Sequence, residues 1–192
     1  MRSTRIERIT KEVNILLEIN LDGQGNSTVT TGIKFFDHLL TTLAKHGLFD
    51  LKLMAEGDLL HHTIEDVALV LGEAFTELLA QKKGIRRFGS AYVPMDEALA
   101  RATIDFSGRP FFRLNLQLEQ VEIEDMKSED IQHFFQSFAL AAQANLHLTV
   151  LYGENEHHKI EAGMKALALA IREAIAYEAR LKDQIPSAKG VL

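Results

Sequence analysis

Residues 61–66 read HHTIED, and residues 157–162 read HHKIEA, one half of the 192-residue chain later. A glycine stands four residues before each pair of histidines, at Gly57 and Gly153. Self-similarity at a fixed offset is the sequence signature of an internal repeat. We therefore expect the chain to consist of two copies of one supersecondary unit.

The segments around the two motifs predict the same order of secondary structure. Apolar and mostly polar residues alternate from Lys11 to Leu21, which is the period of a half-buried strand. Strands are expected near 11–21, 27–33, 48–54, 97–105, 111–118 and 146–152, and helices near 35–47, 61–81, 128–144 and from 157. The order is ββαβα twice, in repeats of about 1–90 and 91–180. The fold class expected is α+β, with helices layered between two mostly antiparallel sheets.

The composition restricts what the protein binds. The formal net charge is −6 and the 21 Lys and Arg residues are spread along the chain, which argues against a nucleic-acid partner. The chain has no cysteine, so disulfides and thiolate metal sites are excluded. No apolar run reaches the roughly 18 to 20 residues of a membrane span, and the N-terminal residues lack the apolar segment of a signal peptide. We expect a cytoplasmic protein with a small-molecule substrate and no membrane or nucleic-acid partner.

The repeated histidines predict metal ligation. On a helix, Glu65 shares a face with His61 or His62, whereas the adjacent histidines diverge by about 100° and would reach two different ions. His38 and His133 precede the two pairs by 23 and 24 residues, each in the first helix of its repeat. The eight expected ligands are His38, His61, His62, Glu65, His133, His157, His158 and Glu161. They divide into two sites of three imidazoles and one carboxylate, a donor set that suits Mn, Fe, Co, Ni or Zn.

Three short stretches look suited to an anion: GIRRFG at 84–89, DFSGRP at 105–110 and IPSAKG at 185–190. Each places cations beside glycine or proline, where side chains and backbone N–H groups can bind a phosphate. Lys165 lies four residues after Glu161, one helical turn from the expected metals. His46 and His147 fall outside the repeat and are expected to be structural.

The residues alone leave two other functions open. A metal-binding storage or structural protein would use the histidines with closed coordination and would not need a phosphate pocket. A metal-dependent hydrolase would share the ions, but it would not require an imidazole ring in its substrate. Ordinary surface histidines are a third interpretation, which the repetition of His-His-x-x-Glu at matched offsets disfavours.

Nine short motifs occur in the order typical of one enzyme family. They are TGIKFFDH, KHGLFDL, HHTIED, GIRRFG, PMDEAL, DFSGRP, HFFQSFA, GENEHHKIEA and PSAKG. Together they make nearly the whole chain resemble imidazoleglycerol-phosphate dehydratase of histidine biosynthesis.

The resemblance implies a reaction, a cofactor and an assembly. The reaction would be dehydration of D-erythro-imidazole-glycerol phosphate to imidazole-acetol phosphate, with the substrate ring held as an imidazolate between two Mn²⁺ ions per active site. Other divalent transition metals could replace manganese. Each repeat would have the ribosomal S5 domain 2-like fold, and 1–192 would be a single dehydratase domain with a substrate-binding tail at 181–192. The chain would form a homo-oligomer of 24 subunits with active sites at subunit interfaces.

The same resemblance assigns roles to residues. It places the metal on the eight ligands named above. Substrate contacts would be made by Glu12, His61, His157, Lys165, Arg87, Arg109, Ser187 and Lys189, five of which, Arg87, Arg109, Lys165, Ser187 and Lys189, would surround the phosphate. The catalytic carboxylates would be Glu12, Glu65 and Glu161, and either Glu12 or Glu161 would remove the proton.

Overall fold

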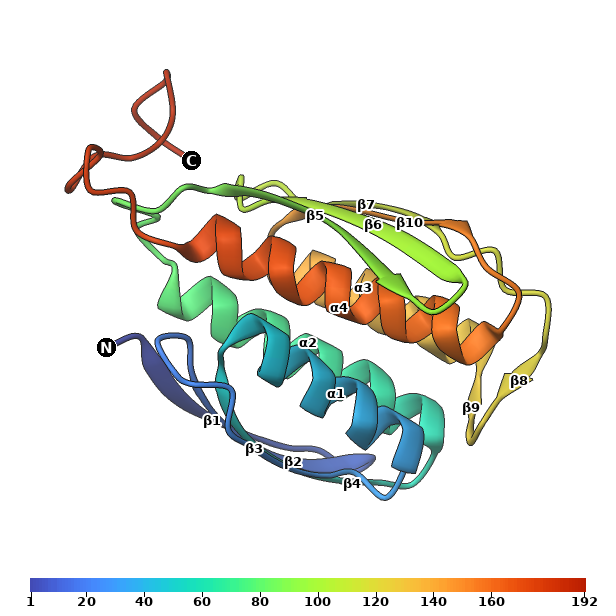
Figure 1. Cartoon of the computed structure of the whole chain (residues 1–192). Helices are drawn as coiled ribbons and strands as arrows, with labels where there is room; N and C mark the ends of the chain where they lie inside the picture. Colours follow the sequence, from blue (N-terminus) through green and yellow to red (C-terminus); the bar gives the residue numbers. More distant parts are fainter.

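The computed structural model describes residues 1–192, and each half of the chain forms a four-stranded sheet with two helices against one face (Figure 1). The first half contains β1 (Ser3–Ile9), β2 (Val13–Asn20), β3 (Ser27–Thr30), α1 (Lys34–Gly47), β4 (Asp50–Gly57) and α2 (Leu60–Leu78). The second half contains β5 (Phe88–Met95), β6 (Ala98–Asp105), β7 (Phe111–Asn115), β8 (Glu122–Ile123), β9 (Met126–Lys127), α3 (Ser128–Ala141), β10 (Asn145–Tyr152) and α4 (Glu156–Ile175). Apart from the short β8–β9 hairpin, the two halves have the same order of elements.

The two sheets also share one topology. Their strand orders are β1-β2-β4-β3 and β5-β6-β10-β7. In each sheet the last pair, β4 with β3 and β10 with β7, is parallel, and the other pairs are antiparallel. The expected α+β class with two mostly antiparallel sheets is confirmed.

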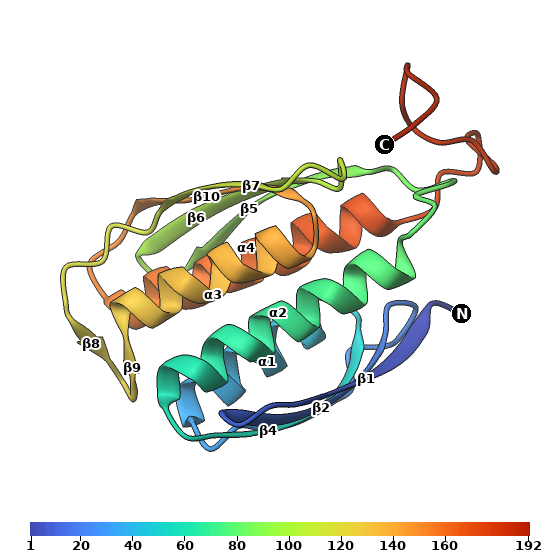
Figure 2. The same cartoon turned by 180° about the vertical axis from the view of Figure 1, so that it is seen from behind.

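The four helices form two layers between the sheets (Figure 1 and, from behind, Figure 2). The helix α1 packs against α4, and α2 packs against α3. The interior is one cluster of 50 buried apolar residues drawn from both halves of the chain. Because each helix buries one side against its sheet and another against the opposite helices, neither half would close its core alone.

Each unit has one strand more than the sequence predicts, so the order is βββαβα. Strand β2 shows the expected alternation, since Val13, Ile15, Leu17 and Ile19 are buried. The unpredicted strand β1 (STRIERI) has only two apolar residues and lies at a sheet edge, where none of its residues is fully buried. The unpredicted strand β5 contains Gly89 and Pro94, which interrupt a strand pattern. A β-carbon at Gly89 would overlap the carbonyl oxygen of Ala170, so glycine permits the close contact of β5 with α4.

The longest helix, α4, has 20 residues and is buried over most of its surface. Its buried residues include three charged side chains in the first two turns, Glu156, Lys159 and Glu161. Buried charges are costly unless they are paired or bind an ion. None of the four helices combines the length and the apolar character needed to cross a lipid bilayer.

Candidate functional site

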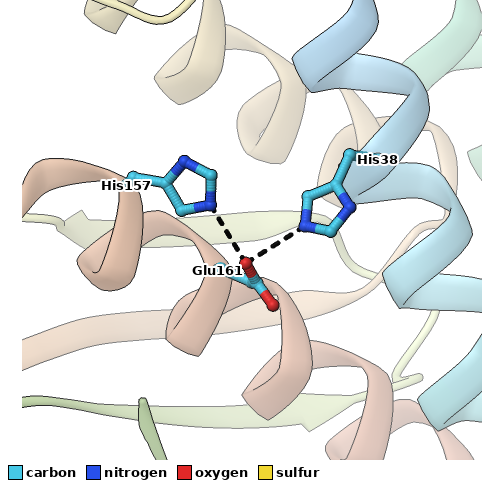
Figure 3. Close-up of side chains that lie close together, drawn as sticks. All are labelled: His38, His157 and Glu161. Atoms are coloured by element: carbon cyan, nitrogen blue, oxygen red, sulfur yellow. Dashed lines mark hydrogen bonds and ion pairs between the residues drawn. The ribbon is translucent and has the colours of Figure 1, made fainter. Parts of the chain in front are cut away.

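The first histidine group consists of His38 on α1 and of His157 and Glu161 on α4 (Figure 3). The Nε2 atoms of both histidines lie 3.1 Å from the Oε2 atom of Glu161. His157 and Glu161 are four residues apart, so one turn of α4 places them on the same face. The ring of Phe35 lies against that of His157, with a centroid distance of 4.7 Å. Three donor atoms therefore converge from two helices that pack against each other.

The second histidine group repeats this arrangement with His61 and Glu65 on α2 and His133 on α3. Glu65 Oε1 lies 3.2 Å from His133 Nε2, and Glu65 Oε2 lies 3.7 Å from His61 Nε2. Although Glu65 is close, His133 Nε2 is buried and has no hydrogen-bond partner. Leaving a buried polar nitrogen unpaired is costly, and an ion bound to Nε2 would remove that cost.

The donor spacing in both groups fits metal coordination. Donors about 2.1 Å from an ion and at right angles to each other lie about 3.0 Å apart. The closest donor pairs in the two groups are 3.1 Å and 3.2 Å apart. All donor atoms within each group lie within 4.8 Å of one another. The chain offers nitrogen and oxygen donors and no cysteine sulfur.

Each group joins the two repeats, which the sequence does not reveal. The first-helix histidine of one repeat meets the His-x-x-x-Glu pair of the other, because α1 packs on α4 and α2 packs on α3. Within one chain each group has two imidazoles and one carboxylate, whereas the sequence predicts three imidazoles and one carboxylate.

The second histidine of each pair lies outside both groups. His62 Nδ1 donates a hydrogen bond to Asp58 Oδ1, and His158 Nδ1 donates one to Glu97 Oε2, both at 2.7 Å. These carboxylates raise the pKa of both imidazoles above the usual range. Adjacent residues on a helix point about 100° apart, as expected, so the two rings of each pair face different surroundings.

The first turn of α4 is fixed on both sides of its histidines. The side chain of Asn155 caps the helix by accepting a hydrogen bond from the backbone N–H of His158. Lys159 and Glu156 form a buried ion pair at 3.4 Å. The Lys159 ammonium also donates to the Gln117 carbonyl at 2.9 Å. These bonds hold the turn that carries the second His-His pair against the loop after β7.

Glu161 is ionised by its surroundings. Burial raises the pKa of its carboxyl, but hydrogen bonds from Lys165 and His38 outweigh burial and lower the pKa to about 2. The Lys165 ammonium lies 2.8 Å from Glu161 Oε1, so each oxygen of the carboxylate has its own cationic or imidazole partner. At neutral pH the group therefore presents a full negative charge to its two histidines.

The cations expected around a phosphate are divided between two places in the chain. Lys165 lies beside Glu161 in the first histidine group. Arg87 lies near the C-terminal end of α4. Its guanidinium pairs with Asp105 at 2.6 Å and donates to the Pro186 carbonyl at 3.0 Å. This contact holds the start of the C-terminal tail against the second sheet.

Arg109, Ser187 and Lys189 lie in loops that local hydrogen bonds shape. The Arg109 carbonyl accepts a hydrogen bond from Asn145 Nδ2 at 2.6 Å. The Ser187 hydroxyl accepts one from the backbone N–H of Lys189 at 3.2 Å. These bonds fix the backbone at Arg109 and at Lys189, two of the cations predicted to bind the phosphate.

Lys82 is a further cation near Arg87 and Arg109, and it is not among the phosphate-binding residues predicted from the sequence. The Lys82 ammonium lies beside Gly108, in the loop after β6. A β-carbon added to Gly108 would be 3.1 Å from Lys82 Nζ. Burial, together with the positive charge of Arg87, lowers the pKa of Lys82. In the sequence, Lys82 belongs to a Lys-Lys-Gly stretch that has the signature of a helix end.

Glu12, His46 and His147 lie outside both histidine groups. Glu12 Oε2 is exposed and 4.0 Å from His62 Nδ1. Burial lowers the pKa of His46. The His147 ring lies beside Phe111 with a centroid distance of 5.7 Å.

Comparisons with known proteins agree with the motifs. The profile of the imidazoleglycerol-phosphate dehydratase family matches residues 31–171. The chain is 48% identical over 195 residues to the imidazoleglycerol-phosphate dehydratase of Thermoanaerobacter pseudethanolicus, with both proteins covered completely. It is 50% identical to that of Gluconobacter oxydans over 194 residues, covering 100% of this chain and 98% of the relative.

Two solved structures share the fold. The crystal structure of imidazoleglycerol-phosphate dehydratase from Staphylococcus aureus aligns with a TM-score of 0.85 and 33% identity, over 92% of this chain and 99% of that one. The dehydratase from Pyrococcus furiosus aligns with a TM-score of 0.82 and 33% identity, over 97% and 100% of the two chains.

Proposed function

Because the chain belongs to the imidazoleglycerol-phosphate dehydratase family, and so to the hydro-lyases of histidine biosynthesis, we propose that it works with two divalent ions held by its histidine groups. The reaction is removal of water from D-erythro-imidazole-glycerol phosphate to give imidazole-acetol phosphate. The observation that carries the metal is the pair of His/His/Glu groups, whose donor spacing fits an ion. The unpaired, buried Nε2 atom of His133 supports it independently.

Manganese is the ion we favour. A set of imidazoles and carboxylates without sulfur suits Mn²⁺, although other divalent transition metals accept the same donors. When bound, two such ions would supply Lewis-acid polarisation of the substrate imidazole ring, which makes the proton on the neighbouring carbon more acidic. The residues of the chain then hold the ring and move the proton.

Two ligands per chain remain to be placed, and we assign them to neighbouring subunits. His62 and His158 lie outside the groups of their own chain, which leaves each group one imidazole short of the expected four ligands. A homo-oligomer of 24 subunits, with active sites between subunits, would supply the missing imidazoles. A wide, open hollow of the single chain lies away from both histidine groups, on the outer face of the first sheet beside Arg5, Glu18 and Lys52.

Glu12 is the carboxylate that we assign as the general base. The pKa of Glu161, at about 2, makes it a weak proton acceptor at neutral pH and a good charged ligand. Glu65 contacts both histidines of the second group, which also favours a ligand role. Glu12 is exposed and lies next to His62, one of the two imidazoles that we assign to a neighbouring site. Its carboxylate would therefore reach the substrate together with that imidazole.

The phosphate would be bound by Arg87, Arg109, Ser187 and Lys189 at one end of the second sheet, with Lys165 contributed at the histidine groups. Within one chain Lys165 lies apart from Arg87, so a complete phosphate site again requires adjacent subunits. We propose that 1–192 forms one dehydratase domain of two repeats, in which 181–192 is a substrate-binding tail. We also propose that the protein is cytoplasmic. The contact of Arg87 with Pro186 supports the role of the tail.

Arg109→Ala is expected to raise the KM for imidazole-glycerol phosphate by about tenfold or more, because the variant lacks a charge-assisted hydrogen bond to the phosphate. Metal content should stay unchanged, since Arg109 is not part of either histidine group. Steady-state kinetics with metal analysis measures both quantities. Arg113→Ala, which removes an exposed arginine from β7, is the matched control. An unchanged KM in Arg109→Ala would remove this residue from the phosphate site.

The proposed reaction is tested directly with the purified protein and D-erythro-imidazole-glycerol phosphate. We expect imidazole-acetol phosphate to form while no inorganic phosphate is released. Release of phosphate, or turnover of simple phosphate esters, would instead identify a metal-dependent hydrolase. A protein that binds metal but converts neither substrate would be a storage or structural protein.

A further inference from the structure

All four imidazoles of the two His-His pairs have the same type of partner on Nδ1. His61 donates to Asp130 at 2.6 Å. His157 donates to Glu124 at 3.1 Å, and the second histidines donate to Asp58 and Glu97 as described above. None of these four carboxylates is among the site residues that the sequence predicts. Because the contact occurs four times, we infer that each of these histidines needs a carboxylate partner on Nδ1.

A carboxylate on Nδ1 decides which nitrogen can bind a metal. An ionised carboxylate can only accept hydrogen bonds, so Nδ1 carries the ring proton. In a neutral imidazole the lone pair is then on Nε2. His61 Nε2 lies 3.7 Å from Glu65, and His157 Nε2 lies 3.1 Å from Glu161. The nitrogen left free in each ring is therefore the one directed into its histidine group.

Asp130 differs from the other three carboxylates in burial. Its side chain is 5% exposed, whereas those of Asp58, Glu97 and Glu124 are 52%, 36% and 56% exposed. Exposed ion pairs are screened by water and contribute little, but a buried one holds its partner firmly. Asp130 also lies in the first turn of α3, where the helix dipole favours a negative charge.

The position of Asp130 links it to the second histidine group. It lies three residues before His133 on α3, so both side chains project from one face of that helix toward α2. One helix thus supplies a direct donor, His133, and the carboxylate that orients the donor on the opposite helix, His61. The rings of these two histidines are 4.9 Å apart.

We propose that Asp130 is a positioning residue, which fixes the ring proton of the neutral His61 imidazole on Nδ1 and turns its Nε2 atom toward Glu65 and His133. It acts on metal affinity through His61 and does not itself touch the ion or the substrate. This inference rests on the proposed metal-binding function of the second histidine group.

The test is a Mn²⁺ titration of metal-stripped, full-length assembled protein. Asp130→Asn removes the acceptor-only partner of Nδ1, because an amide can donate to Nδ1 through its nitrogen as well as accept through its oxygen, so the ring proton is no longer confined to Nδ1 and Nε2 is no longer kept free for ligation. We expect the Kd of one of the two ions to rise by about 10- to 100-fold, the range measured for partners of metal-bound histidines. The kcat should recover at saturating Mn²⁺. Glu129→Gln, an exposed neighbour in the same turn, should leave the Kd unchanged.

A double-mutant cycle with His61→Ala separates positioning from a general structural role. If Asp130 acts through His61, adding Asp130→Asn to His61→Ala should not weaken Mn²⁺ binding further. Additive losses, or a wild-type Kd in Asp130→Asn, would overturn the proposal. If Asp130→Asn fails to assemble, Asp130→Ala is tested in the same cycle. A wild-type protein that binds no ion would instead overturn the proposed function itself.

Discussion

Protein stripped of divalent ions is expected to lose dehydratase activity by about 10³-fold or more and to regain it when Mn²⁺ is added. Polarisation of the reacting group by a bound ion lowers the barrier by several kcal/mol, and each ~1.4 kcal/mol corresponds to a factor of ten in rate. The donors of both histidine groups converge on helices whose core of 50 apolar residues does not involve the metal. The stripped protein should therefore remain folded.

The measurement combines metal analysis, the dehydration assay and circular dichroism before and after chelation. Eight ligands at four per ion predict two ions per chain. Mg²⁺ is the control ion, because it prefers oxygen ligands and should restore much less activity than Mn²⁺ at imidazole-rich sites. Full activity in protein shown to be free of metal would contradict the two-ion proposal.

The second large effect is expected from Glu161→Gln. The amide has no charge, so His38, His157 and Lys165 would lose the carboxylate on which they converge. We expect turnover to fall by more than about 100-fold, beyond the loss typical of residues that only support a ligand. Kinetics, metal content and an unfolding curve measure the effect on a folded protein. Undiminished turnover would show that the first histidine group is not part of the active site.

His62→Ala extends this prediction to the contact between subunits. In its own chain the His62 ring contacts Asp58 and belongs to neither group, so a local role predicts almost no loss. If His62 completes a metal site of a neighbouring subunit, the variant should lose both turnover and metal while remaining folded. His147→Ala is the control, because that histidine lies outside both groups and in no predicted site. Equal activity in the two variants would exclude His62 as a ligand.

Much of the fold follows from short-range patterns. The alternation in β2 and the helical spacing of α1 are properties of neighbouring residues, and the structure confirms both. The edge strand β1 was not predicted because it is rich in charged residues, is partly exposed to solvent and shows little apolar alternation. The strand β5 was not predicted because it contains Gly89, a residue with low strand propensity. Glycine is needed there because β5 contacts α4 closely, and that contact is visible only in the tertiary structure.

The sequence by itself determined the duplication, the fold class and the two pairs His61–Glu65 and His157–Glu161. The pairs follow from local geometry, since residues four apart on a helix share a face whatever surrounds them. Only the tertiary structure decided that His38 meets His157 and Glu161 of the other repeat, and that Asp130 meets His61. Those contacts depend on which helices pack together between the sheets, and the residues that form them lie far apart along the chain.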